Sequence, residues 1–190
     1  MNKSTWIVAL SLGFIAWILM VTNFVIPFGN FSTSNGVPFF ISPAEIPLVL
    51  GPALAGPPGI AASILALFLF LAKGDFGRLI ATSLNHVVGG IWLVFAYRFS
   101  FQRIKMPLRL VAWMVILVIY FLMMIILFPL FNPGQFHFSL AGVLGFIQVA
   151  WLPSLYELLG TLIITSMILF ALPEKYRKPL WIKSKSRLEK

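Results

Sequence analysis

A few residues that could carry chemistry lie within or beside strongly apolar stretches of the sequence, and two of them are the carboxylates Glu45 and Glu157. Placing a charge in hydrocarbon costs several kcal/mol unless the charge is paired or wetted, so such residues suggest a functional site. Glu157 belongs to a polar and aromatic stripe, Trp151, Ser154, Glu157 and Thr161, spaced 3, 3 and 4 residues apart. On a helix this stripe should face an interior or a wet cavity. We therefore expect Glu157 to contact a small-molecule ligand. Trp151 is a further candidate, which either stacks on such a ligand or belongs to an aromatic belt at the membrane interface.

Glu45 has two compatible interpretations. The order Ser42-Pro43-Ala44-Glu45 is typical of a capping box, with serine at the N-cap, proline at the first helical position and glutamate at the third. Such a cap explains Glu45 without a ligand. A cap near the outer end of a short helix also borders any outward-facing cavity, so Glu45 remains a candidate ligand contact.

Asn85 and His86 form a further candidate pair, in the segment SLNHVVGG. On a helix Thr82, His86 and Gly89 share one face, so a polar strip meets a place where another backbone can approach closely. His86 is then either a buried histidine that bonds to a neighbouring helix or a ligand contact. Asn85 and His86 are both included among the substrate-binding candidates.

The sequence offers no recognisable catalytic or metal-binding pattern. It has no HExxH, GxSxG or P-loop motif, it contains two histidines, and it has no cysteine. We therefore expect no enzyme activity, no metal and no cofactor. Any energy coupling would have to come from another protein.

The composition indicates an all-α integral membrane protein that forms one membrane domain over residues 1–190. Hydrophobic residues make up 60% of the chain and charged residues 10%, compared with about 45–50% and about 25% in soluble domains. A membrane span needs about 20 apolar residues, and turn signals divide the apolar stretches. We predict six transmembrane helices, at about 6–26, 42–55, 57–72, 79–97, 108–127 and 153–172, with 138–151 as a partly inserted helix on the outer side.

The distribution of basic residues predicts the orientation. The net charge is +9, but the basic residues cluster in short loops and in a tail over residues 173–190, not along one face, which argues against nucleic acid and for a membrane surface. With six spans the inner side holds Lys3, four basic residues between Arg98 and Arg109, and seven in the tail. Lys73 and Arg78 lie outside. Both termini are therefore expected in the cytoplasm, with lipid as a partner.

The stretch PLVLGPALAGPPGIAASI, from Pro47 to Ile64, resembles the helix 2–3 region of the substrate-binding S components of energy-coupling factor (ECF) transporters. The resemblance implies uptake of a vitamin-like micronutrient across the cell membrane, with a transmembrane coupling subunit and ABC-type ATPases as partners. In that family a small-residue motif on helix 1 contacts the coupling subunit. Ala9, Gly13 and Ala16 occupy the comparable positions here, with glycine in place of the second alanine.

Two other protein classes stay open. The Gly-Pro turn also resembles that of the five-helix receptor module of LytS-type sensory kinases, and the size and helix number also suit a scaffold that resembles the rod-shape protein MreD. A small molecule that remains bound through purification is expected of a substrate-binding protein and not of a scaffold.

Overall fold

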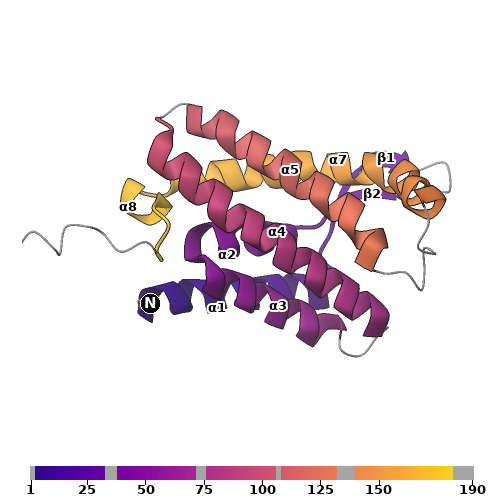
Figure 1. Cartoon of the computed structure of the whole chain (residues 1–190), viewed down its shortest axis with the longest axis horizontal. Coiled ribbons are helices and arrows are strands. Elements are labelled where there is room, and N and C mark those ends of the chain that lie inside the picture. Colours follow the sequence, from indigo (N-terminus) through magenta and orange to yellow (C-terminus); the bar gives the residue numbers. More distant parts are fainter. Residues whose placement is uncertain (1–2, 33–37, 72–75, 106–107, 132–139, 182–190) are drawn as a thin grey trace, which may run out of the picture.

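The computed structural model describes residues 3–32, 38–71, 76–105, 108–131 and 140–181. Almost all of them are helical, as the composition predicts. The elements are α1 (Lys3–Val21), β1 (Ile26–Ser32), β2 (Pro38–Ile41), α2 (Glu45–Ala55), α3 (Pro57–Leu71), α4 (Phe76–Arg103), α5 (Leu108–Phe131), α7 (Leu140–Ala171) and α8 (Glu174–Arg177) (Figure 1).

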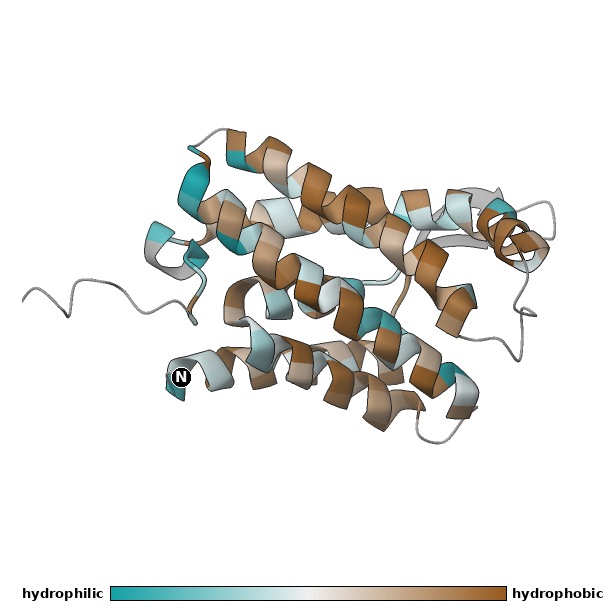
Figure 2. Cartoon of the chain, in the orientation of Figure 1, coloured by the Kyte–Doolittle hydropathy of each residue, from teal (hydrophilic) through white to brown (hydrophobic). Residues whose placement is uncertain are grey.

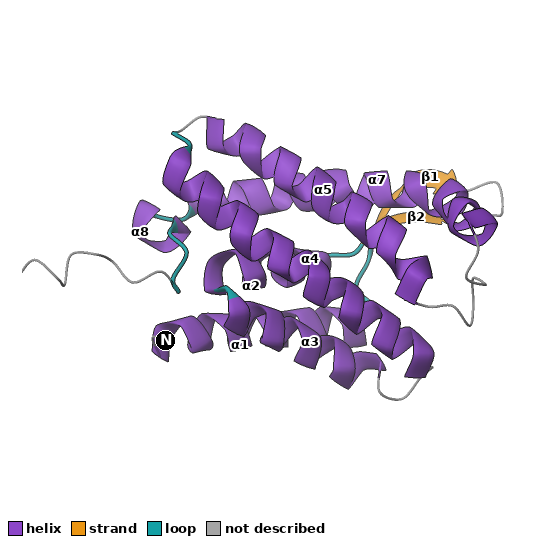
Figure 3. Ribbon diagram, viewed as in Figure 1, coloured by secondary structure: helices purple, strands orange, loops and turns teal. Residues whose placement is uncertain are grey.

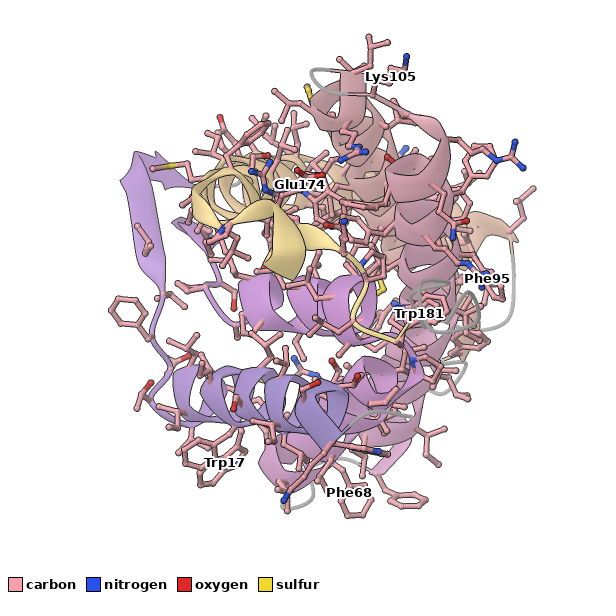
Figure 4. All side chains as sticks on the ribbon, turned by 90° about the vertical axis from the view of Figure 1, so that its left-hand side faces the viewer. Trp17, Phe68, Phe95, Lys105, Glu174 and Trp181 are labelled. Atoms are coloured by element: carbon pink, nitrogen blue, oxygen red, sulfur yellow. The ribbon has the colours of Figure 1, made fainter. Side chains whose placement is uncertain are left out.

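Four described helices, α1, α4, α5 and α7, are long and apolar enough to cross a membrane, whereas α2 and α3 are shorter. Large apolar side chains face outward, such as Phe68 at 50% exposure and Phe95 at 64%, and both point away from the helices in Figure 4. In Figure 2 the helices are mostly brown, and hydrophilic colour gathers where α4 ends and α8 lies. This surface is compatible with a multi-pass membrane protein.

The helices form two groups with α2 between them. Helices α1 and α3 pack against each other on one side, while α4, α5 and α7 lie on the other side (Figure 1). Helix α2 contacts α1, α3, α4 and α7, and nearly all of its residues are buried. The short, apolar α2 is therefore the centre of the fold.

Helix α2 ends where the Gly-Pro turn predicts. Gly56 has φ +66°, which glycine adopts without steric cost, and its N–H donates to the Pro52 carbonyl at 2.9 Å. Pro57 then begins α3, at the position where its missing N–H is harmless. The two helices touch at Gly59, because a β-carbon there would overlap the Gly51 carbonyl.

The predicted capping box is wrong. Ala44 occupies the N-cap of α2 and makes no side-chain cap bond, so Glu45 is the first helical residue and its side chain does not cap the helix. The reason is the preceding strand, since Ile41 pairs with Ile26 in the β1–β2 hairpin and Ser42 follows it directly. The Ser42 backbone carbonyl instead accepts the Glu45 N–H at 3.1 Å.

The β1–β2 hairpin was not predicted, because its segment is rich in polar and turn-forming residues. Its second strand, β2, packs against α7 (Figure 3). Ile41 fits against Gly160 of α7, where an added β-carbon would be 2.6 Å from Ile41 Cδ1. The hairpin thereby fixes where α2 starts relative to α7.

Residues 140–171 form one bent helix, not a separate inserted helix followed by a span. Pro153 lies inside α7 and removes the hydrogen bond that the Val149 carbonyl would otherwise accept. The first part of α7 is seen end-on in Figure 1, while the rest runs along the bundle. Positions 138 and 139 of the predicted inserted helix lie outside the described residues.

The face of α1 that carries Ala9, Gly13 and Ala16 packs inside the chain. Ala9 and Ala16 have no exposed surface, and a β-carbon on Gly13 would lie 2.8 Å from the Ala62 carbonyl oxygen of α3. The small residues do permit a close helix approach, but their partner is α3. The expected contact of these three residues with a coupling subunit stays a prediction.

The segment after α7 closes the end of the bundle at which α4 ends. The Tyr97 hydroxyl donates to the Arg177 carbonyl at 2.8 Å, and the Leu180 N–H donates to the Leu54 carbonyl at 2.8 Å. Trp181 lies against Gly56, beside the end of α2 (Figure 4). The remainder of the basic tail, residues 182–190, is outside the described part of the chain.

The contact between α2 and α3 leads to a stability prediction. Gly59→Ala should lower the free energy of unfolding by about 3 kcal/mol, because its methyl group must displace the α2 backbone. Gly145→Ala is the matched control, since nothing lies within 4 Å of its added β-carbon and alanine favours a helix by about 1 kcal/mol. Unfolding by SDS titration in mild detergent measures both, and equal stability of the two variants would contradict the close contact.

Candidate functional site

A cavity of about 220 Å³ lies between α2, α4, α5 and α7. Its lining combines two carboxylates, an amide and several aromatic side chains. The lining residues are Glu45, Asn85, Tyr120, Phe121, Met124, Ile125, Phe128, Phe146, Ser154 and Glu157. Three of the five substrate-binding residues expected from the sequence, Glu45, Asn85 and Glu157, thus come together from three different helices.

A buried hydrogen-bond chain holds Glu45. The Tyr120 hydroxyl bonds to the Glu45 carboxyl group and lies 3.3 Å from His86 Nδ1. Tyr120 and His86 are 1% and 6% exposed. The Tyr120 hydroxyl, which can both donate and accept, thereby bridges the Glu45 carboxyl group and the His86 ring. One residue from each of α2, α5 and α4 is thereby connected.

Glu157 is positioned by the chain that precedes α2. Its carboxylate accepts a hydrogen bond from the Ser42 backbone N–H and lies within electrostatic range of Glu45. No basic residue is present among the described residues that line the cavity. The two carboxylates therefore repel each other, and a positive charge between them would relieve that repulsion.

Two acceptor atoms at this cavity are buried without a partner. Within the described chain, neither Glu45 Oε2 nor Asn85 Oδ1 has a hydrogen-bond partner, whereas Asn85 Nδ2 donates to the Met124 carbonyl at 3.0 Å. Asn85 is only 2% exposed. Buried polar atoms in proteins are nearly always hydrogen-bonded. These two acceptors call for a donor that enters the cavity.

Aromatic rings form the other side of the cavity. Phe128 of α5 and Phe146 of α7 stack, with ring centroids 5.6 Å apart and 28° between their planes. Phe121 lines the cavity beside them. Aromatic faces attract cations and accommodate flat apolar groups. The arrangement suits a ligand with a positively charged, hydrogen-bond-donating end and a flat body.

His86 and Trp151 do not line the cavity. Tyr120 separates His86 from the cavity and contacts both His86 and Glu45. This is the arrangement of a buried histidine that bonds to a neighbouring helix. Trp151 is 53% exposed, so its expected contact with a ligand stays a prediction. The spacing from Trp151 to Ser154 defines one face only in a regular helix, and Pro153 bends α7 between them.

Tyr120 is the site residue that the sequence analysis did not identify. It lies in the middle of an apolar helix, and a buried tyrosine hydroxyl usually requires a hydrogen-bond partner. The need of a buried hydroxyl for a partner is the signal in the sequence that could have identified Tyr120. No group of three or more His, Asp or Glu side chains within the described residues is placed to hold a metal ion.

Comparison of the chain with protein-family models, with curated proteins and with solved structures finds no match. The description of the site therefore rests on its own geometry, which is an open cavity with acidic and aromatic lining in a helical protein whose longer helices could span a membrane.

The hydrogen bond between Tyr120 and Glu45 can be tested by a double-mutant cycle. Tyr120→Phe should lower the free energy of unfolding by about 1–3 kcal/mol, because it leaves a buried carboxylate without its donor. The same change in a Glu45→Gln background should cost at least about 0.5 kcal/mol less. SDS unfolding of the four proteins gives both values, and strict additivity would show that the two side chains are not coupled.

Proposed function

We propose that this protein is the substrate-binding membrane subunit of an uptake transporter of the ECF type, and that its substrate is a small, vitamin-like molecule with an amine or another cationic group. In this proposal six helices, α1 to α5 and α7, lie in the cell membrane, and both termini are cytoplasmic. A separate coupling subunit and ABC-type ATPases supply the energy.

The observation that carries the proposal is the pair of carboxylates, Glu45 and Glu157, at one cavity with no basic residue among its described lining residues. In an apolar surrounding this pair needs a compensating positive charge. The two unpartnered acceptors, Glu45 Oε2 and Asn85 Oδ1, add positions for the N–H groups of that ligand. A cavity of about 220 Å³ favours a small molecule over a peptide.

The cavity also helps to distinguish the proposed transporter subunit from the two alternatives, a membrane scaffold and a sensory receptor. A membrane scaffold resembling MreD has no need for a buried acidic cavity, whose charges cost stability when it is empty. A receptor resembling the LytS-type module would also bind a small molecule. Co-purification with a coupling subunit distinguishes a transporter from a receptor.

Gly13 also borders an outward-facing surface to which a coupling subunit can bind. An apolar groove of about 310 Å³ runs between α1 and α3, with Gly13, Ala62 and Ala66 among its small residues and Leu10 and Phe14 among its large ones. Small residues flanked by large ones favour close packing with another helix. We assign the coupling subunit to this groove.

Glu157→Gln tests the proposed binding site. The amide preserves shape but removes the charge, so a charge-assisted hydrogen bond worth about 1.5–3 kcal/mol is lost. Affinity for a cationic ligand should fall about 10- to 150-fold. Stability of the empty protein should stay unchanged or rise slightly, because one of two repelling charges is gone.

The measurement is native mass spectrometry of protein purified in mild detergent, which reports the fraction that retains a co-purified small molecule. Glu174→Gln is the matched control, because it removes one carboxylate at the exposed end of the bundle. If Glu157→Gln unfolds the protein while its folded remainder keeps the same small molecule, Glu157 is a structural residue and the assignment fails.

A further inference from the structure

A second cavity lies at the end of the bundle where α8 closes it, and it shares no lining residue with the acidic site. It has a volume of about 50 Å³ and is formed by α4, α5, α7 and α8. Its polar lining consists of Tyr97, Ser100, Arg109, Trp113, Ser166 and Arg177. None of the described lining residues is acidic, so this cavity has the opposite charge to the first.

Both arginines of this cavity are held through one nitrogen each. Arg109 Nε donates to the Ile104 carbonyl at 2.6 Å, and Arg177 Nε donates to the Leu172 carbonyl at 2.8 Å. The guanidinium of Arg109 also lies over the Phe101 ring, 4.2 Å from its centroid. A guanidinium has five N–H donors, and within the described residues only the Nε–H of each arginine is bonded, so each group can still donate to an anion.

Tyr97 and Ser166 add hydroxyl groups to the lining of this cavity. The Tyr97 hydroxyl donates to the Arg177 carbonyl and lies within electrostatic range of both arginine charges. Ser166 Oγ is buried and has no hydrogen-bond partner in the described part of the protein. An arginine pair with a free hydroxyl is the donor set that proteins use to hold phosphate oxygens.

We propose that this cavity binds a phosphate group of net negative charge, either the headgroup of an anionic membrane lipid or a free phosphate. The position favours a lipid, because Arg98, Arg103 and Lys105 lie at the same end of the bundle and basic pockets between helices attract anionic headgroups. Phe170, which is 45% exposed and lines the cavity, offers an apolar surface to an acyl chain. The site is independent of the proposed transport function.

Lipid retention measured by native mass spectrometry tests this site. Purified protein is titrated with phosphatidylglycerol, with phosphatidylcholine and with inorganic phosphate. Phosphatidylglycerol should bind at least about tenfold more tightly than phosphatidylcholine, because the choline cation is repelled by both arginines. Arg109→Gln and Arg177→Gln should each lower its affinity about tenfold, equivalent to about 1.4 kcal/mol. Arg103→Gln is the matched control, since Arg103 carries the same charge at the same end but does not line the cavity.

The outcomes separate the two sources of phosphate. Binding of phosphatidylglycerol without binding of inorganic phosphate identifies a lipid site, and arginine-dependent binding of inorganic phosphate alone identifies a site for a free anion. If either arginine variant does not fold, Ser166→Ala decides, because it removes a donor without changing charge and should still weaken binding several-fold. Equal retention of the two lipids, or an equal loss in Arg103→Gln, would overturn the proposal.

Discussion

The burial of two carboxylates in an apolar protein is the constraint around which the rest of this structure is arranged. Glu45 and Glu157 border the same cavity, and each requires a donor that does not come from water. Tyr120 supplies one and the Ser42 backbone N–H supplies the other. Because these donors belong to α5 and to the segment before α2, the carboxylates fix how α2, α5 and α7 meet.

The short length of α2 follows from the need to bury Glu45 within the bundle. Helix α2 has 11 residues, or about 16 Å at 1.5 Å per residue, which is about half the thickness of a bilayer core. Because α2 is this short, its first residue, Glu45, lies inside the bundle and not at its end. The β1–β2 hairpin provides the chain that reaches this point, and Gly56 ends α2 early enough for α3 to return beside it.

Several parts of this arrangement could be predicted from the sequence. Long apolar stretches indicated the helices, and the Gly-Pro turn indicated where α2 ends and α3 begins. Glu45, Asn85 and Glu157 were identified because polar groups in hydrocarbon need a reason to be there. The hairpin and the start of α2 were not identified correctly, because each depends on contacts between distant segments. Trp151 does not line the cavity, because a helical stripe assumes a regular helix and Pro153 lies inside α7.

The most direct test of a cation-selective cavity uses the absence of cysteine from the sequence. A single Ser154→Cys change places one thiol at the cavity, where its reaction with a cationic and an anionic methanethiosulfonate reagent of similar size is timed. The two carboxylates should make the cationic reagent react at least about tenfold faster, and this preference should disappear when Glu45 and Glu157 are both replaced by glutamine. Equal rates for the two reagents, or a faster anionic reagent, would contradict the account.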